Sequence, residues 1–224
     1  MRRNLHETDA YLEAKKVTRD NSLGSLLKYP REIMIVVGLT AGGTAAFYTY
    51  TIYMQKFLRL SVGLNDSQTT MVTAGSLIFA LFLQPIYGAI SDRIGRKWLL
   101  IFFGVCGTLF TIPLLSALVE TKTAFGAFLL ICAAWLIVSG YTSINAVVKA
   151  ELFPTSVRAT GVGLPYALTV SIFGGTADSV ALWLKSIGHE VWFSYYLTAI
   201  IAVSLAVYIT MRDTKKHSAM HRHE

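Results

Sequence analysis

The sequence predicts an all-α membrane protein with six transmembrane helices, and three observations support this fold class. Hydrophobic residues make up 54% of the 224-residue chain and charged residues only 15%. In soluble domains about a quarter of the residues are charged. The hydrophobic residues gather in six stretches, each close to the roughly 20 residues that cross a bilayer. The connecting segments are short, so consecutive helices must run antiparallel. The predicted spans are residues 32–56, 67–90, 98–119, 123–148, 158–184 and 190–211.

The segment that precedes the first span, residues 1–31, is polar and carries charges of both signs. It lacks the apolar core of a signal peptide. Leu23, Leu26 and Leu27 form a small apolar face that suits the surface of a membrane. We expect this segment, and the polar tail at residues 212–224, to be cytoplasmic.

The first span carries a polar stripe, formed by Thr44, Tyr48, Thr51 and Gln55. These residues follow the spacing i, i+4, i+7 and i+11, which places them on one face of a regular helix. Polar side chains inside a membrane face the interior of the bundle or a water-filled path. The stripe therefore either lines a cavity or forms hydrogen bonds between helices.

Other spans carry similar polar residues that are candidates for the same cavity. The candidates on the second span share a face with Ser91. The candidate on the fourth span shares an arc with Ser139 and Thr142. The candidate on the fifth span lies beside Pro165, a residue that bends helices. These candidates are Gln84, Tyr87, Asn145 and Tyr166.

Asp178 is the acidic residue that lies well inside a predicted span. An ionised carboxylate is costly in lipid, so its surroundings must be polar or the group must be protonated. Two interpretations remain open: Asp178 is a proton-coupling acid, or it is a hydrogen-bonded structural acid or an acid near the outer mouth. Lys185 is about two helical turns away, so we do not expect it to pair directly with Asp178.

The basic residues indicate how the chain crosses the membrane. If residues 1–31, 91–97, 149–158 and 212–224 share one side, that side holds every one of the 20 Lys and Arg residues except four. The exceptions are Lys56, Arg59, Lys122 and Lys185. Cytoplasmic loops carry the excess of positive charge, so both termini are predicted to be cytoplasmic. Topology then explains the net charge of +7, and a nucleic-acid partner is not required.

Two cytoplasmic segments carry motifs. The turn between the second and third spans combines two glycines with one acidic and three basic residues: Gly88, Asp92, Arg93, Gly95, Arg96 and Lys97. We expect Gly88 to let a neighbouring helix approach, Asp92 to accept hydrogen bonds, and Gly95 to adopt the positive φ of a tight reversal. The basic side chains are placed to reach carboxylates on other helices.

The second motif, after the fourth span, contains Glu151, Pro154 and Arg158. Pro154 ends a helix and sets a rigid turn. Glu151 and Arg158 can pair across this turn, or they can pair with the segment 88–97.

Both motifs resemble the major facilitator superfamily, in particular its metabolite:proton symporter branch. The stretches Phe47–Lys56 and Ile172–Ala177 look most like the α-ketoglutarate permeases of that branch. The resemblance implies a bacterial inner-membrane carrier that takes up α-ketoglutarate or a similar carboxylate with protons by alternating access. Citrate, betaine and shikimate are the alternative substrates. The resemblance also implies that the segment 88–97 stabilises one conformation of the carrier.

Carriers of this superfamily have twelve spans in two halves, and the six spans here resemble the C-terminal half. The resemblance therefore implies a missing N-terminal six-helix half as the partner. A six-span membrane protein that binds partners without transport is the rival interpretation. A membrane enzyme is not expected, because the chain lacks a His-Glu-x-x-His motif and paired intramembrane carboxylates.

No cofactor or metal is expected. His217, His221 and His223 lie in the polar tail, where nothing fixes the geometry that a metal requires. Cys106 and Cys132 lie within apolar spans and are expected to be buried thiols rather than a disulfide.

Overall fold

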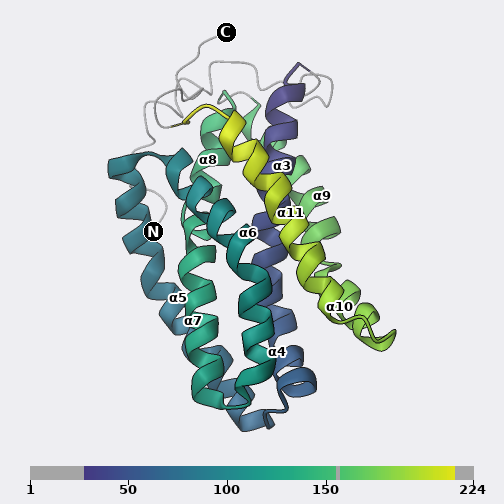
Figure 1. The fold of residues 1–224 in the computed structure, drawn as a ribbon. Coiled ribbons are helices and arrows are strands. Elements are labelled where there is room, and N and C mark those ends of the chain that lie inside the picture. Colours follow the sequence, from purple (N-terminus) through teal and green to yellow (C-terminus); the bar gives the residue numbers. More distant parts are fainter. Residues whose placement is uncertain (1–27, 155–156, 215–224) are drawn as a thin grey trace, which may run out of the picture.

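The computed structural model describes residues 28–154 and 157–214, and all regular elements in these ranges are helices. Six helical segments within them are long and apolar enough to cross a membrane. They run side by side in an elongated bundle (Figure 1). The predicted all-α fold with six spans is therefore confirmed. The apolar face at Leu23, Leu26 and Leu27 and the histidines of the tail lie outside the described residues.

The first span, Pro30–Val62, departs from regular α-helical geometry in two places. α3 (Pro30–Tyr48) is followed by a π-helical turn at Thr49–Tyr53 and by the short α4 (Met54–Phe57). A second π-helical turn covers Leu58–Val62, and Gly63 ends the span with φ +84°. A π turn contains more residues per turn than an α-helix, so it changes which face later residues occupy.

The second and third spans are single helices, α5 (Asp66–Ile94) and α6 (Arg96–Thr121). Asn65 caps α5, because its side chain accepts a hydrogen bond from the Gln68 backbone N–H at 2.9 Å while the Gln68 side chain accepts one from the Asn65 N–H. Gly95 alone separates α5 from α6. Its φ of +101° is accessible to glycine, which confirms the reversal predicted at this position.

The fourth and fifth spans each contain two helices, and the sixth is a single helix. α7 (Ala124–Thr142) and α8 (Asn145–Leu152) form the fourth, α9 (Arg158–Thr169) and α10 (Ala177–Ser186) the fifth, and α11 (Val191–Thr210) the sixth. A π-helical turn at Val170–Gly174 separates α9 from α10. This interruption follows Pro165, where the sequence predicted a bend.

α3 packs closely against α11 at the centre of the bundle, and glycines make this approach possible. The Ser204 hydroxyl of α11 accepts a hydrogen bond from the Gly42 N–H at 2.8 Å and donates one to the Gly38 carbonyl at 2.5 Å. A Cβ at Gly42 would come within 2.8 Å of the Ile201 Cα. Small residues serve this purpose in membrane bundles, because apolar burial alone does not draw helices together in lipid.

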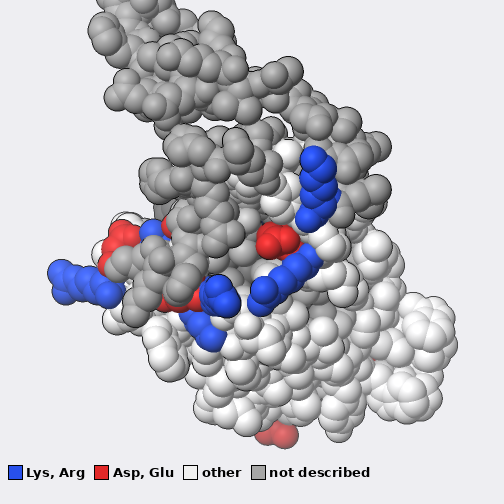
Figure 2. All heavy atoms as spheres, turned by 90° about the horizontal axis from the view of Figure 1, so that it is seen from above, with Lys and Arg blue, Asp and Glu red and all other residues white. Residues whose placement is uncertain are grey.

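Charged residues gather at the end of the bundle that holds the α5–α6 turn, α8 and the last turn of α11, which we call the motif end. Figure 2 looks onto it and shows Lys, Arg, Asp and Glu side chains of the described residues from the left margin across the middle of the face, with mostly white residues toward the lower and right margins. The opposite end holds α4, the α6–α7 turn and the α10–α11 turn (Figure 1), and we call it the distal end.

Two expectations about individual residues of the motif end are wrong. Apart from its chain neighbours and the backbone of its own helix, no atom of the described residues lies within 4 Å of a Cβ built at Gly88, so this glycine is not required for a close helix approach in the described structure. Lys149, which the sequence analysis assigned to a cytoplasmic loop, belongs to α8 and is only 2% exposed. The helix continues to Leu152, because helix-favouring residues follow Lys149 until Pro154 ends the segment.

Candidate functional site

The main candidate site is a cavity of about 420 Å³ between α3, α5, α7, α8 and α9. Aromatic rings and neutral polar groups line it together with a few aliphatic side chains. Five residues singled out by the sequence are among the lining residues: Thr44, Tyr48, Gln84, Asn145 and Tyr166. The structure thus brings together predicted polar residues from four helices, α3, α5, α8 and α9.

A chain of hydrogen bonds runs along one wall of this cavity. Gln84 of α5 lies between two residues of α7, donating to the Ser139 hydroxyl at 3.4 Å and accepting from the Thr142 hydroxyl at 3.0 Å. The Asn145 amide donates to the Thr142 carbonyl at 2.9 Å. These bonds hold the amides of Gln84 and Asn145 in fixed positions at the cavity wall.

Three predicted cavity residues do not line the cavity. Tyr87 donates to the Leu136 carbonyl at 2.6 Å, and Thr51 donates to the Phe47 carbonyl at 2.7 Å. Gln55 is exposed on α4. The π-helical turn at Thr49–Tyr53 explains the last two, because it rotates Thr51 and Gln55 away from the face that Thr44 and Tyr48 share.

Lys149 lies next to the cavity, although the sequence analysis did not select it. Its ammonium group donates to the Asn145 side-chain oxygen at 3.0 Å and lies 3.9 Å from the centre of the Tyr166 ring. The ring of Tyr141 is farther away, at 5.9 Å. One signal pointed to this contact, because Asn145 and Lys149 are four residues apart and therefore share a helix face.

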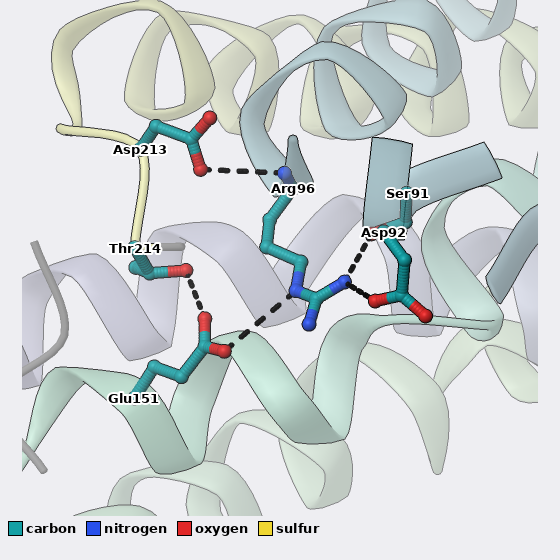
Figure 3. A network of polar contacts seen from close by, with 6 residues as sticks. All are labelled: Ser91, Asp92, Arg96, Glu151, Asp213 and Thr214. Atoms are coloured by element: carbon teal, nitrogen blue, oxygen red, sulfur yellow. Dashed lines mark hydrogen bonds and ion pairs between the residues drawn. The ribbon is translucent and has the colours of Figure 1, made fainter. Parts of the chain in front are cut away.

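The second candidate feature is a polar network at the motif end, centred on Arg96 (Figure 3). The Arg96 guanidinium donates to the Ser91 hydroxyl at 2.8 Å and to the Asp92 carboxylate at 2.5 Å. Its Nε lies 3.7 Å from Oε1 of Glu151, which is an ion pair rather than a short hydrogen bond. The Arg96 backbone N–H donates to Asp213 at 3.3 Å.

Glu151 connects α8 to the segment after α11. While one of its oxygens faces Arg96, the other accepts a hydrogen bond from the Thr214 hydroxyl at 2.6 Å. The Asp213 carboxylate lies close to Gly95, so a Cβ at this position would require that side chain to move. The two sequence motifs therefore meet in one network that also includes the end of α11.

The other motif residues have different partners. Arg158 donates to the Phe153 carbonyl at 3.3 Å and so bridges the turn that contains the buried Pro154, without pairing with Glu151. Lys97 donates to the Ile209 carbonyl near the end of α11 at 2.6 Å. Arg93 is exposed. Of the pairings that the sequence left open, the structure contains the one between Glu151 and the segment 88–97.

Asp178 lies near the distal end, at the first turn of α10, and forms an ion pair with Lys56 of α4. Lys185 pairs instead with Glu190, 2.8 Å away, which confirms that it does not pair directly with Asp178. The sequence analysis did not anticipate Lys56 as a partner, because the π-helical turn at Thr49–Tyr53, which precedes α4 and packs against α10, is not visible in the hydropathy pattern. The other carboxylate oxygen of Asp178 is buried and has no hydrogen-bond partner among the described residues.

Among the described residues, no group of three or more His, Cys, Asp or Glu side chains is placed to hold a metal ion. Cys106 and Cys132 are both free, as expected, but they are half-buried rather than buried. The lining residues of the cavity offer hydrogen bonding and aromatic contact, and the ammonium group of Lys149 lies behind them.

Comparisons with known proteins identify a family and several relatives of the chain. The chain is 42% identical over 216 residues to the α-ketoglutarate permease of Escherichia coli K12, which covers 96% of this chain and 50% of the permease. It is 28% identical to the ectoine/proline transporter ProP of Corynebacterium glutamicum, over 86% of this chain and 38% of that protein. A citrate-proton symporter of Salmonella typhi is also 28% identical, over 81% of this chain and 42% of the symporter. No solved structure matches.

The chain spans half the length of these relatives or less. Six apolar helices identify it as an integral membrane protein, and the names of its relatives describe transporters rather than enzymes. The family model described as sugar (and other) transporter matches residues 2–224, nearly the complete sequence. The chain therefore belongs to this transporter family of the major facilitator superfamily.

Proposed function

We propose that this chain is the C-terminal half of a secondary carrier that takes up α-ketoglutarate, or a similar dicarboxylate, together with protons. The observation that carries the proposal is the polar cavity, which has hydroxyl and amide groups suited to the carboxylate and keto oxygens of such a solute. The identity to the Escherichia coli α-ketoglutarate permease supports this choice of substrate over citrate, betaine and shikimate. In this proposal the carrier lies in a bacterial inner membrane with both chain termini cytoplasmic.

Transport would occur by alternating access, in which this half rocks against an N-terminal six-helix half around a site near the middle of the membrane. The network of Arg96, Glu151 and Asp92 would close the motif end in one conformation and separate in the other. Domain-level rearrangements in carriers are biased by such groups of contacts, which form in one state and break in the other.

The test is uptake of radiolabelled α-ketoglutarate by cells that lack their own carrier for it. The chain is produced together with the N-terminal half of the Escherichia coli permease as a second polypeptide, and each half is also produced alone. We expect uptake from the pair that is lost when a protonophore is added. Unlabelled citrate, proline, betaine and shikimate are then compared as competitors.

Two outcomes would contradict the proposal. Uptake of α-ketoglutarate that is unaffected by the protonophore would exclude proton coupling. Accumulation of both halves in the membrane, bound to each other but without uptake of any of these solutes, would favour a membrane protein that binds partners without transporting.

A further inference from the structure

Lys149 is a buried cation whose partners in the structure are all neutral. Its side chain is 2% exposed, and its ammonium group contacts the Asn145 oxygen and the ring of Tyr166. Among the described residues, Lys149 and Glu151 are the two charged residues that are buried. Glu151 lies two positions further along α8, where side chains do not face each other, and its carboxylate contacts Arg96 and Thr214.

This arrangement leaves the charge of Lys149 incompletely compensated. Moving an ammonium group out of water is costly even after the protein relaxes. A cation–π contact and a hydrogen bond to an amide oxygen each offset only part of that cost. A carboxylate next to the ammonium would supply the compensation that the neutral partners do not.

Lys149 lies directly behind the cavity wall, although it is not itself a lining residue. The groups that surround the ammonium, Tyr141, Asn145 and Tyr166, are themselves lining residues of the 420 Å³ cavity. Asn145 is held by its bond to the Thr142 carbonyl, and Thr142 is held by Gln84. The ammonium is thus positioned by fixed groups at the cavity wall rather than by a mobile loop.

We propose that Lys149 is the residue of this half that binds a carboxylate group of the transported solute. The proposal rests on the proposed transport function and deepens it, because it names the charge that selects for carboxylates. α-Ketoglutarate has two carboxylates, and Lys149 binds one of them from this half. The incoming carboxylate accepts a hydrogen bond from the ammonium group, either in place of the Asn145 oxygen or in addition to it, because the ammonium has three donors.

The first experiment compares Lys149→Gln, Lys149→Met and the control Lys122→Gln in the pair of halves described above. Lys122 is exposed at the α6–α7 turn, so its variant removes an equal charge away from the cavity. We expect Lys149→Gln and Lys149→Met to raise the half-saturation concentration for α-ketoglutarate by about tenfold or more, as loss of a charge-assisted hydrogen bond requires. We expect Lys122→Gln to leave it unchanged.

The second experiment separates loss of charge from loss of folding. Lys149→Cys is introduced after Cys106 and Cys132 have been replaced by Ser, and the thiol is modified with aminoethyl methanethiosulfonate or with the neutral methyl reagent. The aminoethyl group restores a positive charge at nearly the length of lysine. We expect it to restore the half-saturation concentration toward that of the unmodified Lys149 carrier, and the methyl reagent not to do so.

The outcomes distinguish this proposal from the transport proposal. If the unmodified pair takes up citrate, proline or betaine but not α-ketoglutarate, the proposed substrate is wrong, and the Lys149 variants are scored on the carboxylate that is transported. If uptake of that carboxylate is insensitive to Lys149→Gln, or if both reagents act alike on Lys149→Cys, the role of Lys149 is overturned. Uptake of an uncharged sugar alone would overturn both proposals.

Discussion

Arg96, at the start of α6, forms an ion pair with Glu151, near the end of α8, and this pair joins the two motifs of the sequence. Both side chains are largely buried, with 15% and 10% of their areas exposed. Removing one member of such a pair leaves the other without its partner in a place with little water. The pair is therefore a site where a single substitution should affect both stability and transport.

Glu151→Gln tests the contribution of this pair to stability. We expect it to destabilise the purified chain by about 1–3 kcal/mol, the range for loss of a hydrogen bond or ion pair to a charged group. The midpoint of thermal unfolding in detergent measures the change. Asp66→Asn is the matched control, because Asp66 pairs with Arg59 at the surface with 84% of its side chain exposed, and such pairs contribute little. Equal shifts for both variants would contradict the prediction.

Asp92→Asn tests the contribution of the same network to the transport cycle. The Asp92 carboxylate accepts a hydrogen bond from Arg96 at the motif end, but it does not line the cavity. We expect the maximal rate of α-ketoglutarate uptake to fall severalfold while the half-saturation concentration changes less, because a conformational step is altered rather than substrate binding. An unchanged maximal rate with a raised half-saturation concentration would refute this assignment.

Gly42→Ala is predicted to destabilise the chain, whereas Gly88→Ala is not. A Cβ at Gly42 would lie 2.8 Å from the Ile201 Cα and 2.7 Å from the Ser204 hydroxyl, so α3 and α11 must separate. We expect a loss of about 1–3 kcal/mol, typical of overpacking. Gly88 lies within α5 and has open space around it, so alanine there should be neutral or stabilising by up to about 1 kcal/mol. Thermal unfolding of both variants in detergent compares them directly, and a destabilised Gly88→Ala chain would show that a packing contact is made there.

The sequence predicted the spans well because hydrophobicity over 20 residues is a strong signal, and it predicted the reversal at Gly95 because glycine tolerates positive φ. It placed Thr44 and Tyr48 at the cavity correctly, because α3 is regular as far as Tyr48 and residues four positions apart then share a helix face. It failed for Gln55, because hydropathy does not reveal a π-helical turn. It also failed for Lys149, since a lysine beside a motif at the end of a span is normally a loop residue, and only the packing of α9 against α8 shows that Tyr166 covers it.

The ion pair between Lys56 and Asp178 provides a test of the two roles that the sequence left open for Asp178. If the acid is structural, Asp178→Asn leaves Lys56 uncompensated, and neutralising both residues removes that penalty. We expect Asp178→Asn to reduce α-ketoglutarate accumulation in the pair of halves and the double variant Lys56→Gln/Asp178→Asn to restore much of it, because the pair joins α4 to α10 at the distal end. If Asp178 instead carries the coupled proton, both variants will fail to accumulate substrate against a gradient, while exchange of internal for external α-ketoglutarate continues. Measuring accumulation and exchange in the same cells therefore decides between an ion pair that holds two helices together and an acid that links transport to protons.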